Sequence, residues 1–136
     1  MGLTIGKVAK RGGVNLQTIR YYEREKLLPA PPRLASGYRI YTDQTVRRIR
    51  FIKRAQEIGF TLAEIRELLA IRIDAERDSS DVRTLAQAKI ADIEEKIQTL
   101  NRMKEALGRV TGRCSGCGPA SECPILESID SEETLQ

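Results

Sequence analysis

The feature that most limits the fold of this sequence is a long run of regularly spaced apolar residues in its second half. After a polar segment at residues 78–81, apolar side chains recur every three or four residues as far as Gly112, which predicts one long helix. A chain of 136 residues is too short to cover a narrow apolar seam of that length. We therefore expect a homodimeric coiled coil, the alternative being that the seam packs back onto the N-terminal half. The seam consists of Ala86, Ile90, Ile93, Ile97, Leu100, Met103, Leu107 and Val110.

The two halves of the chain carry opposite charge. Residues 1–56 hold 13 Lys and Arg against 3 Asp and Glu, a net charge of +10, whereas residues 57–136 have a net charge of −6. A small basic segment that also contains all four tyrosines is typical of nucleic-acid binding. A solvated basic surface is the alternative. We expect the first half to bind nucleic acid.

Two short helices are expected at the N-terminus. Thr4 can cap the first helix, which Gly12 and Gly13 end, and Asn15 can cap the second. In the second helix Leu16 and Ile19 fall on one side, so the polar residues face other directions. Two short helices joined by a glycine turn form a helix-turn-helix unit.

The next segment predicts a two-stranded wing. Three prolines at residues 29–32 exclude a helix there, because they remove backbone donors and favour extended backbone. In the segment from Arg33 to Tyr41, Ser36 and Gly37 are the turn, and Tyr38 and Ile40 alternate with Arg39 and Tyr41.

Two further helices should follow the wing. Thr42 can cap a third helix that ends at Gly59, and Thr61 with Glu64 forms a capping box that opens a fourth. The buried stripe of the fourth helix is expected to be Leu62, Ile65, Leu68 and Leu69.

The composition excludes several classes of function. The chain has no histidine, so there is no catalytic triad, imidazole base or Cys/His zinc finger to find. Its start lacks the apolar region of a secretory signal, and no apolar run approaches the roughly 20 residues that span a bilayer. We therefore expect a cytoplasmic protein without a membrane partner.

Three cysteines, Cys114, Cys117 and Cys123, lie within ten residues of one another. In a reducing compartment an odd number of cysteines favours metal binding or redox chemistry over structural disulfides. Thiolates are soft ligands that select mercury, copper(I), silver, gold, lead, cadmium or zinc over hard cations. The glycine, serine and proline residues between the thiols make a loop flexible enough to close around one ion, the alternative being buried inert thiols.

Four segments of the chain resemble the MerR family of bacterial transcription regulators. They read LTIG at residues 3–6, TIRYYE at 18–23, GYRIY at 37–41 and GFTLAEI at 59–65, and the resemblance covers nearly the whole chain. It implies a mainly α protein: a winged helix-turn-helix dimer with an antiparallel coiled coil and a C-terminal effector site. On this reading residues 1–76 form the DNA-binding domain with its connecting helices, residues 77–112 the dimerisation helix, and residues 113–136 the metal-binding loop and tail.

The resemblance places the DNA contacts on the second helix and the wing. A recognition helix presents side chains from its first turns to base edges and phosphates in the major groove, and the wing can fix the position of the duplex without reading sequence. Of the two adjacent tyrosines, one can enter the core while the other reaches a phosphate. The candidate DNA-binding residues are Gln17, Thr18, Arg20, Tyr21, Tyr22, Arg24, Arg33, Tyr38 and Arg39.

The choice of metal rests on conflicting features of the loop. Cys114 and Cys123, separated by eight residues and followed by proline and isoleucine, resemble the ligand pair of mercury-responsive members. Those members take a third thiol from the start of the partner's long helix, where this chain has Ser79, and serine there is typical of sensors of copper(I), silver and gold. Cys117 can supply the missing sulfur. We expect Hg(II), with the monovalent ions next and lead, cadmium or zinc third.

The function that the resemblance implies is metal-dependent control of transcription, with no enzymatic step. The dimer would sit on a palindromic promoter element and distort an overlong spacer when metal binds, so that RNA polymerase engages both promoter elements. A thiol-based redox sensor, with Cys114 and Cys117 as the reactive pair, and a small metal buffer are the alternatives from other classes.

Overall fold

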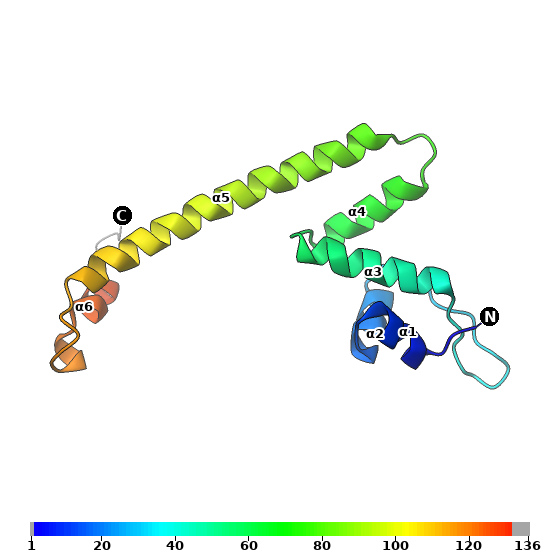
Figure 1. The fold of residues 1–136 in the computed structure, drawn as a ribbon, viewed down its shortest axis with the longest axis horizontal. Helices are drawn as coiled ribbons and strands as arrows, with labels where there is room; N and C mark the ends of the chain where they lie inside the picture. Colours follow the sequence, from blue (N-terminus) through cyan, green and yellow to red (C-terminus); the bar gives the residue numbers. More distant parts are fainter. Residues whose placement is uncertain (1, 132–136) are drawn as a thin grey trace. The chain divides into compact units, whose positions relative to one another are not determined.

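Polar caps set the ends of the first two helices. In the computed structural model, which describes residues 2–131, α1 spans Ile5–Gly12 and α2 spans Leu16–Arg24 (Figure 1). The Thr4 hydroxyl accepts a hydrogen bond from the Lys7 N–H at 3.3 Å, and the Asn15 side chain accepts one from the Thr18 N–H at 2.7 Å. Gly13 ends α1 at a φ of 72°, a left-handed conformation that favours glycine. The predicted helix-turn-helix is confirmed.

Helices α3 and α4 also begin near their predicted caps. Helix α3 spans Asp43–Glu57, and α4 spans Leu62–Ile73 behind a capping box in which both hydrogen bonds between Thr61 and Glu64 form. Thr42 occupies the N-cap position of α3, but its side chain makes no capping hydrogen bond. In α4 the predicted stripe is buried at Ile65 and Leu69 and only partly buried at its other two positions, while Ile71 is buried in addition.

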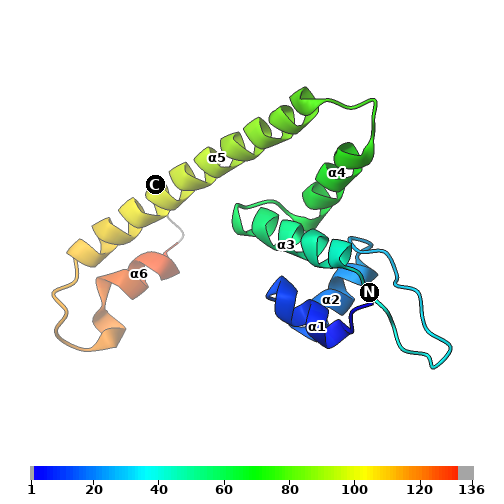
Figure 2. The same ribbon diagram turned by 45° about the vertical axis from the view of Figure 1, so that its right-hand side comes forward.

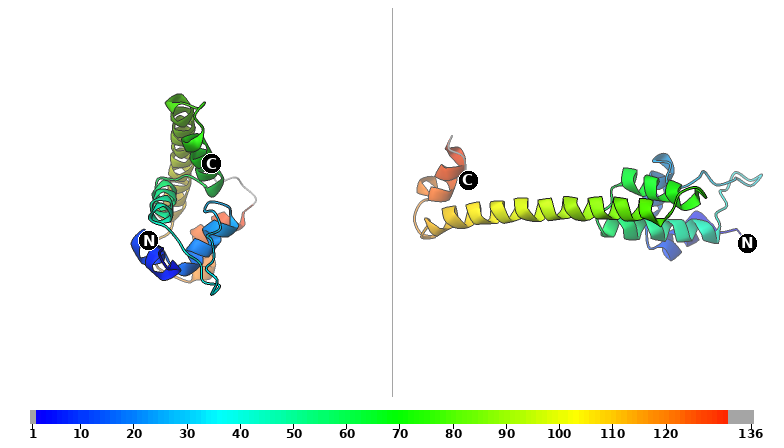
Figure 3. Two further views of the ribbon diagram at one scale, coloured as in Figure 1. Left: turned by 90° about the vertical axis from the view of Figure 1, so that its right-hand side faces the viewer. Right: turned by 90° about the horizontal axis from the view of Figure 1, so that it is seen from above.

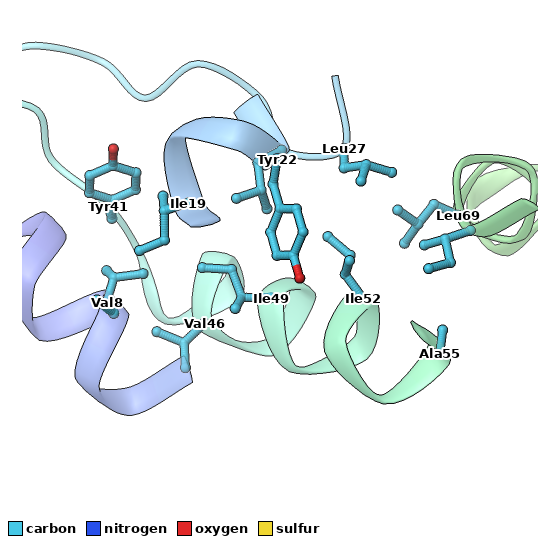
Figure 4. Packing of buried hydrophobic residues seen from close by; sticks show 13 residues of the cluster. Val8, Ile19, Tyr22, Leu27, Tyr41, Val46, Ile49, Ile52, Ala55 and Leu69 are labelled. Carbon is cyan, nitrogen blue, oxygen red and sulfur yellow. The ribbon is translucent and has the colours of Figure 1, made fainter. Parts of the chain in front are cut away.

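The core of the first unit joins all four of these helices. Contacts divide the chain into two units, Met1–Leu85 and Ala86–Gln136, and the first unit contains one continuous apolar cluster. Figure 4 shows Tyr22 of α2 lying against α3, with its hydroxyl directed at that helix. The fully buried side chains of this cluster are Val8, Ile19, Leu27, Val46, Ile49, Ile52 and Ile65, each no more than 1% exposed.

The predicted two-stranded wing is present only as a loop with two isolated backbone bridges. Within residues 2–131 no strand forms; Arg33 pairs with Arg39, and Tyr41 pairs with Leu3 at the base. Near its tip the Leu34 N–H donates to the Tyr38 carbonyl at 2.8 Å. The prediction of strands was wrong because the segment before Arg33 contains three prolines, which cannot donate to a ladder, so the pairing does not extend. Figure 2 shows this loop between α2 and α3.

Helix α5 spans Ser79–Gly112, 34 residues without a break, as the apolar period predicted (Figure 3). Its first turn is capped by Asp78, whose carboxylate accepts from the Ser80 N–H at 2.8 Å. Along the seam, the side chains from Ile90 to Leu107 are 37–62% exposed, whereas Val110 is buried. None of the helices in the described part of the chain is long and apolar enough to cross a membrane.

After α5 the chain turns through the cysteine loop into a short 3-10 helix, η1 (Ala120–Glu122), and helix α6 (Pro124–Asp130) (Figure 2). Pro124 occupies the first turn of α6, where its missing N–H costs nothing. The last turns of α5 and the inner side of α6 enclose an open, mainly apolar groove of about 770 Å³. Leu107, Val110, Ile125 and Ile129 are among its lining residues.

Candidate functional site

Helix α2 presents an exposed polar surface formed by Gln17, Arg20, Tyr21 and Arg24. Its apolar side is used by the core, since Ile19 is completely buried, although Leu16 is still 40% exposed. The Arg24 guanidinium lies 5.9 Å from the centre of the Tyr21 ring, a cation–π contact that holds the two side chains together on this surface. These four residues are free to meet a ligand, as expected of a recognition helix.

The other two candidates on α2, Thr18 and Tyr22, make hydrogen bonds to other side chains of the fold. The Thr18 hydroxyl donates to the Asn15 carboxamide at 2.9 Å and so strengthens the helix cap. Tyr22 is 3% exposed, and its hydroxyl donates to the Gln56 side chain at 2.8 Å. Burial raises the pKa of that hydroxyl. Of the two adjacent tyrosines, Tyr21 is therefore the one on the surface.

The wing carries two exposed candidates and one engaged one. Tyr38 is 75% exposed, and Arg33 is exposed on the same loop. Arg39 instead donates to the carboxylate of Glu23 in α2 at 2.6 Å, with 36% of its side chain exposed. Hydrogen bonding to Tyr41 and the charge of Glu23 raise the pKa of the Arg39 guanidinium. The wing and α2 are thus joined through Glu23, which sequence reasoning missed because it sought side chains that can donate hydrogen bonds to DNA.

Many of the basic residues in the first half have a structural role. Arg50 donates to the Arg11 carbonyl at 2.8 Å and Lys53 to the Gly13 carbonyl at 2.9 Å, both at the end of α1. Arg48 donates to the Leu27 carbonyl at 2.7 Å, just beyond α2. These cations satisfy carbonyls that a helix end leaves without partners and counter the negative end of its dipole. These side chains keep their charge, which still attracts DNA, but they are held in the fold by these hydrogen bonds.

The cysteine loop brings two of its three thiols together. The Sγ atoms of Cys114 and Cys123 lie 3.7 Å apart, and both residues are half-buried. Gly116 and Gly118 have φ values of 77° and 96°, left-handed turns that let the loop bring its two ends together. Cys117 is exposed and lies apart from this pair, and residues 2–131 contain no cluster of three or more cysteine or acidic side chains arranged to hold a metal ion.

The environment of Cys123 favours its thiolate. The residue occupies the N-cap position of α6, and the N–H groups of Leu126 and Ile125 lower the pKa of its thiol, although the side chain makes no capping hydrogen bond. The neighbouring thiol of Cys114 lowers it further. Cys114 accepts from the Gly116 N–H at 3.4 Å. The pair offers two convergent sulfur ligands to a soft metal ion.

Known proteins match this chain over nearly its whole length. A family model described as "MerR HTH family regulatory protein" matches residues 3–70, and one described as "MerR, DNA binding" matches residues 46–110. The chain is 45% identical to the mercuric resistance operon regulatory protein of Bacillus cereus over 129 residues, which are 95% of this chain and 98% of the relative.

Two solved structures share the fold and hold different metals. The transcription regulator PbrR691 from Ralstonia metallidurans, in complex with lead(II), is 34% identical and superposes with a TM-score of 0.84 over 93% of this chain and 98% of its own. The regulator MerR from Bacillus megaterium, in complex with mercury(II), is 41% identical with a TM-score of 0.72 over 95% of this chain and all of its own. With the helix-turn-helix, the long α5 and the paired thiols, these matches show that the chain belongs to the MerR family of metal-responsive, DNA-binding transcriptional regulators, which are not enzymes.

Proposed function

We propose that this regulator responds to Hg(II) through Cys114 and Cys123 and acts as a homodimer on a palindromic promoter element. The observation that carries the proposal is the convergence of these two thiols, 3.7 Å apart, at the end of α5. The strong similarity to a mercuric resistance regulator and to a mercury-bound structure supports the choice of metal. A cytoplasmic location remains a prediction that accompanies this proposal.

The separation of the two sulfurs is shorter than a linear two-thiolate site requires. Around a tetrahedral ion with metal–sulfur bonds of about 2.3 Å, two thiolates stand roughly 3.8 Å apart, whereas a linear ion needs about 4.6 Å. The observed 3.7 Å matches the first arrangement. The order of the other effectors rests on the family resemblance: copper(I), silver and gold come next, because serine at position 79 is typical of their sensors, and lead, cadmium or zinc come third.

The source of a third sulfur is the second part of this proposal. The family position at the start of the partner's α5 holds Ser79, which cannot donate a thiolate. Cys117 is exposed and belongs to the same flexible loop, so a small rearrangement of residues 115–118 can bring its sulfur to the pair. We infer that Cys117 completes a three-sulfur site when Hg(II) binds.

Dimerisation through α5 is supported by the exposure of its apolar seam. Ile97, Leu100 and Leu107 are 52–62% exposed in the single chain, and the groove beside α6 adds further apolar surface. Apolar side chains in a row of this length are typical of a helix that pairs with another helix. A two-fold dimer presents two copies of α2 and the wing to two halves of a palindrome.

Activation is expected to follow the family's route. Metal binding at the ends of the dimerisation helices would bias the dimer toward a form that distorts the promoter, so that RNA polymerase engages both promoter elements. Without metal the same dimer represses.

A metal panel with cysteine variants tests the effector assignment. Reduced protein is titrated with Hg(II), Cu(I), Ag(I), Pb(II), Cd(II) and Zn(II), and transcription from a promoter carrying the operator is followed in parallel. We expect Hg(II) to bind most tightly, at one ion per site. Cys114→Ser should abolish the metal response while operator binding is retained, with Ser115→Ala as the control in the same loop. A full response from Cys114→Ser would remove the proposed site.

Two further variants separate the coordination schemes. Cys117→Ser should weaken Hg(II) binding yet leave a two-coordinate complex, whereas in a linear monovalent site it should change little. Ser79→Cys should strengthen the response to divalent ions. A redox sensor would instead change its DNA binding on oxidation without metal, and a buffer would bind metal without any effect on transcription.

A further inference from the structure

Few backbone contacts hold the wing in place beside α2. The loop is closed at its base by the pairing of Leu3 with Tyr41, where the Leu3 N–H donates to the Tyr41 carbonyl at 2.7 Å. Higher up, its two arms are joined by the isolated bridge between Arg33 and Arg39 and, at the tip, by a turn in which the Gly37 N–H donates to the Leu34 carbonyl at 2.8 Å. Such a loop can pivot about its base unless side chains fix it, and exposed residues at its tip, such as Tyr38, would move with it.

Glu23 provides a direct link between α2 and the returning arm of the wing. Its side chain, on the last turns of α2, is 12% exposed. One carboxylate oxygen, Oε1, accepts from the Tyr41 hydroxyl at 2.7 Å, and the other, Oε2, accepts from Arg39 at 2.6 Å. Both oxygens are therefore used by residues on either side of Ile40. In Figure 4 the Tyr41 ring lies against the core while its hydroxyl is directed away from it, toward the side on which Glu23 binds it.

The sign of the Glu23 charge makes this position unusual. It is one of only 3 acidic residues among the first 56, and it lies in the helix that faces DNA. A negative charge there repels the phosphate backbone and lowers the general attraction of the surface for DNA. A role in attracting DNA does not explain Glu23, but a role in orienting the groups around it does.

We propose that Glu23 is a positioning residue for operator recognition, which sets the angle of the wing relative to α2 by holding Arg39 and Tyr41. The recognition helix and the wing then reach one duplex at a fixed spacing. The inference rests on the assignment of α2 and the wing as the DNA-binding surface.

Glu23→Gln gives a test in which charge and positioning predict opposite results. The variant removes a negative charge, so general electrostatics predicts tighter binding to any DNA. Positioning predicts that affinity for the operator falls about tenfold, while affinity for an unrelated duplex is unchanged or rises. The operator is a duplex selected from random DNA with the parent protein, and binding is measured by fluorescence anisotropy at several salt concentrations.

Glu25→Gln is the matched control. Glu25 is an acid two residues further along, at the end of α2, and its carboxylate makes only a 3.6 Å ion pair with Arg66. This variant should bind the operator as well as the parent protein or slightly better. Equal behaviour of Glu23→Gln and Glu25→Gln would overturn the inference.

Tyr41→Phe keeps the buried ring and removes only the hydroxyl, so it tests the same link if Glu23→Gln folds poorly. Its operator affinity should also fall, and the double variant should lose no more than Glu23→Gln alone, because both changes break one link. Additive losses would contradict a shared role. Arg20→Ala shows which assignment has failed if Glu23→Gln binds the operator normally. If Arg20→Ala also binds normally, the assignment of the DNA-binding surface is wrong. If Arg20→Ala weakens binding, that surface is right and only the role of Glu23 is wrong.

Discussion

The two units of this chain bury apolar residues in different ways. In the first unit α1 to α4 pack their apolar sides against one another, and seven side chains are buried to 1% exposure or less. In the second unit the apolar residues lie in a row on α5, and most of them remain more than a third exposed. A short chain can complete a core from four short helices, but one long helix needs a second helix for its seam. The first unit therefore completes its core within one chain, whereas the exposed seam of the second unit supports the proposed pairing with a second copy of α5.

The largest effect is expected from Ile97→Asp, which tests the second unit. In a coiled coil this change places a charge at the contact between two helices, at a cost of roughly 3 kcal/mol or more. We expect a monomer in which the first unit stays folded, measured by analytical ultracentrifugation and circular dichroism. Gln98→Asp, on the next residue but off the seam, should leave the dimer intact. An unaltered dimer with Ile97→Asp would remove the coiled coil.

Ile49→Ala tests the first unit in the complementary way. Ile49 is completely buried between α1 and α3, so the cavity should lower the free energy of unfolding by roughly 2–4 kcal/mol. Because this core lies within one chain, the loss should not depend on protein concentration, unlike that of Ile97→Asp. Thermal unfolding at two concentrations checks this. A concentration-dependent loss would mean that the first unit also relies on the partner.

Arg20→Ala should change DNA binding without changing either unit's fold. Arg20 is exposed on α2 and makes no ion pair or hydrogen bond through its side chain within residues 2–131. We expect operator affinity to fall roughly tenfold and, if the side chain meets a phosphate, the salt slope to drop by about one. Arg83→Ala, an exposed cation on α5, is the control and should bind normally.

The smallest effect is expected at Lys26, which follows α2 with a φ of 61°. A left-handed conformation is unfavourable for a residue with a side chain, so Lys26→Gly should stabilise the first unit by about 1 kcal/mol. Lys26→Ala keeps the strain and serves as the control. Chemical denaturation measures both. A destabilised Lys26→Gly variant would show that the lysine side chain contributes more than its backbone costs.

Local chemistry explains what the sequence predicted about the fold. Thr4, Asn15 and the Thr61–Glu64 box each cap a helix within four residues of themselves, so the helix starts could be read directly. The period of α5 is equally local and predicted this helix, while the partner that the same period predicts stays a prediction. The wing was misread because strand pairing depends on residues far apart and on donors that the prolines lack.

In the candidate sites, too, some features follow from the local sequence and others from the packing of the chain. The sequence by itself determined the basic half, the exposed side of α2 and the presence of three soft ligands in one loop. Only the tertiary structure decided that Tyr22 enters the core, that Arg39 is held by Glu23, and that the thiols of Cys114 and Cys123, the pair indicated by the family resemblance, lie 3.7 Å apart. Each of these outcomes depends on which side chains the packing of helices and turns brings within hydrogen-bonding or contact distance, and a linear spacing does not specify that distance.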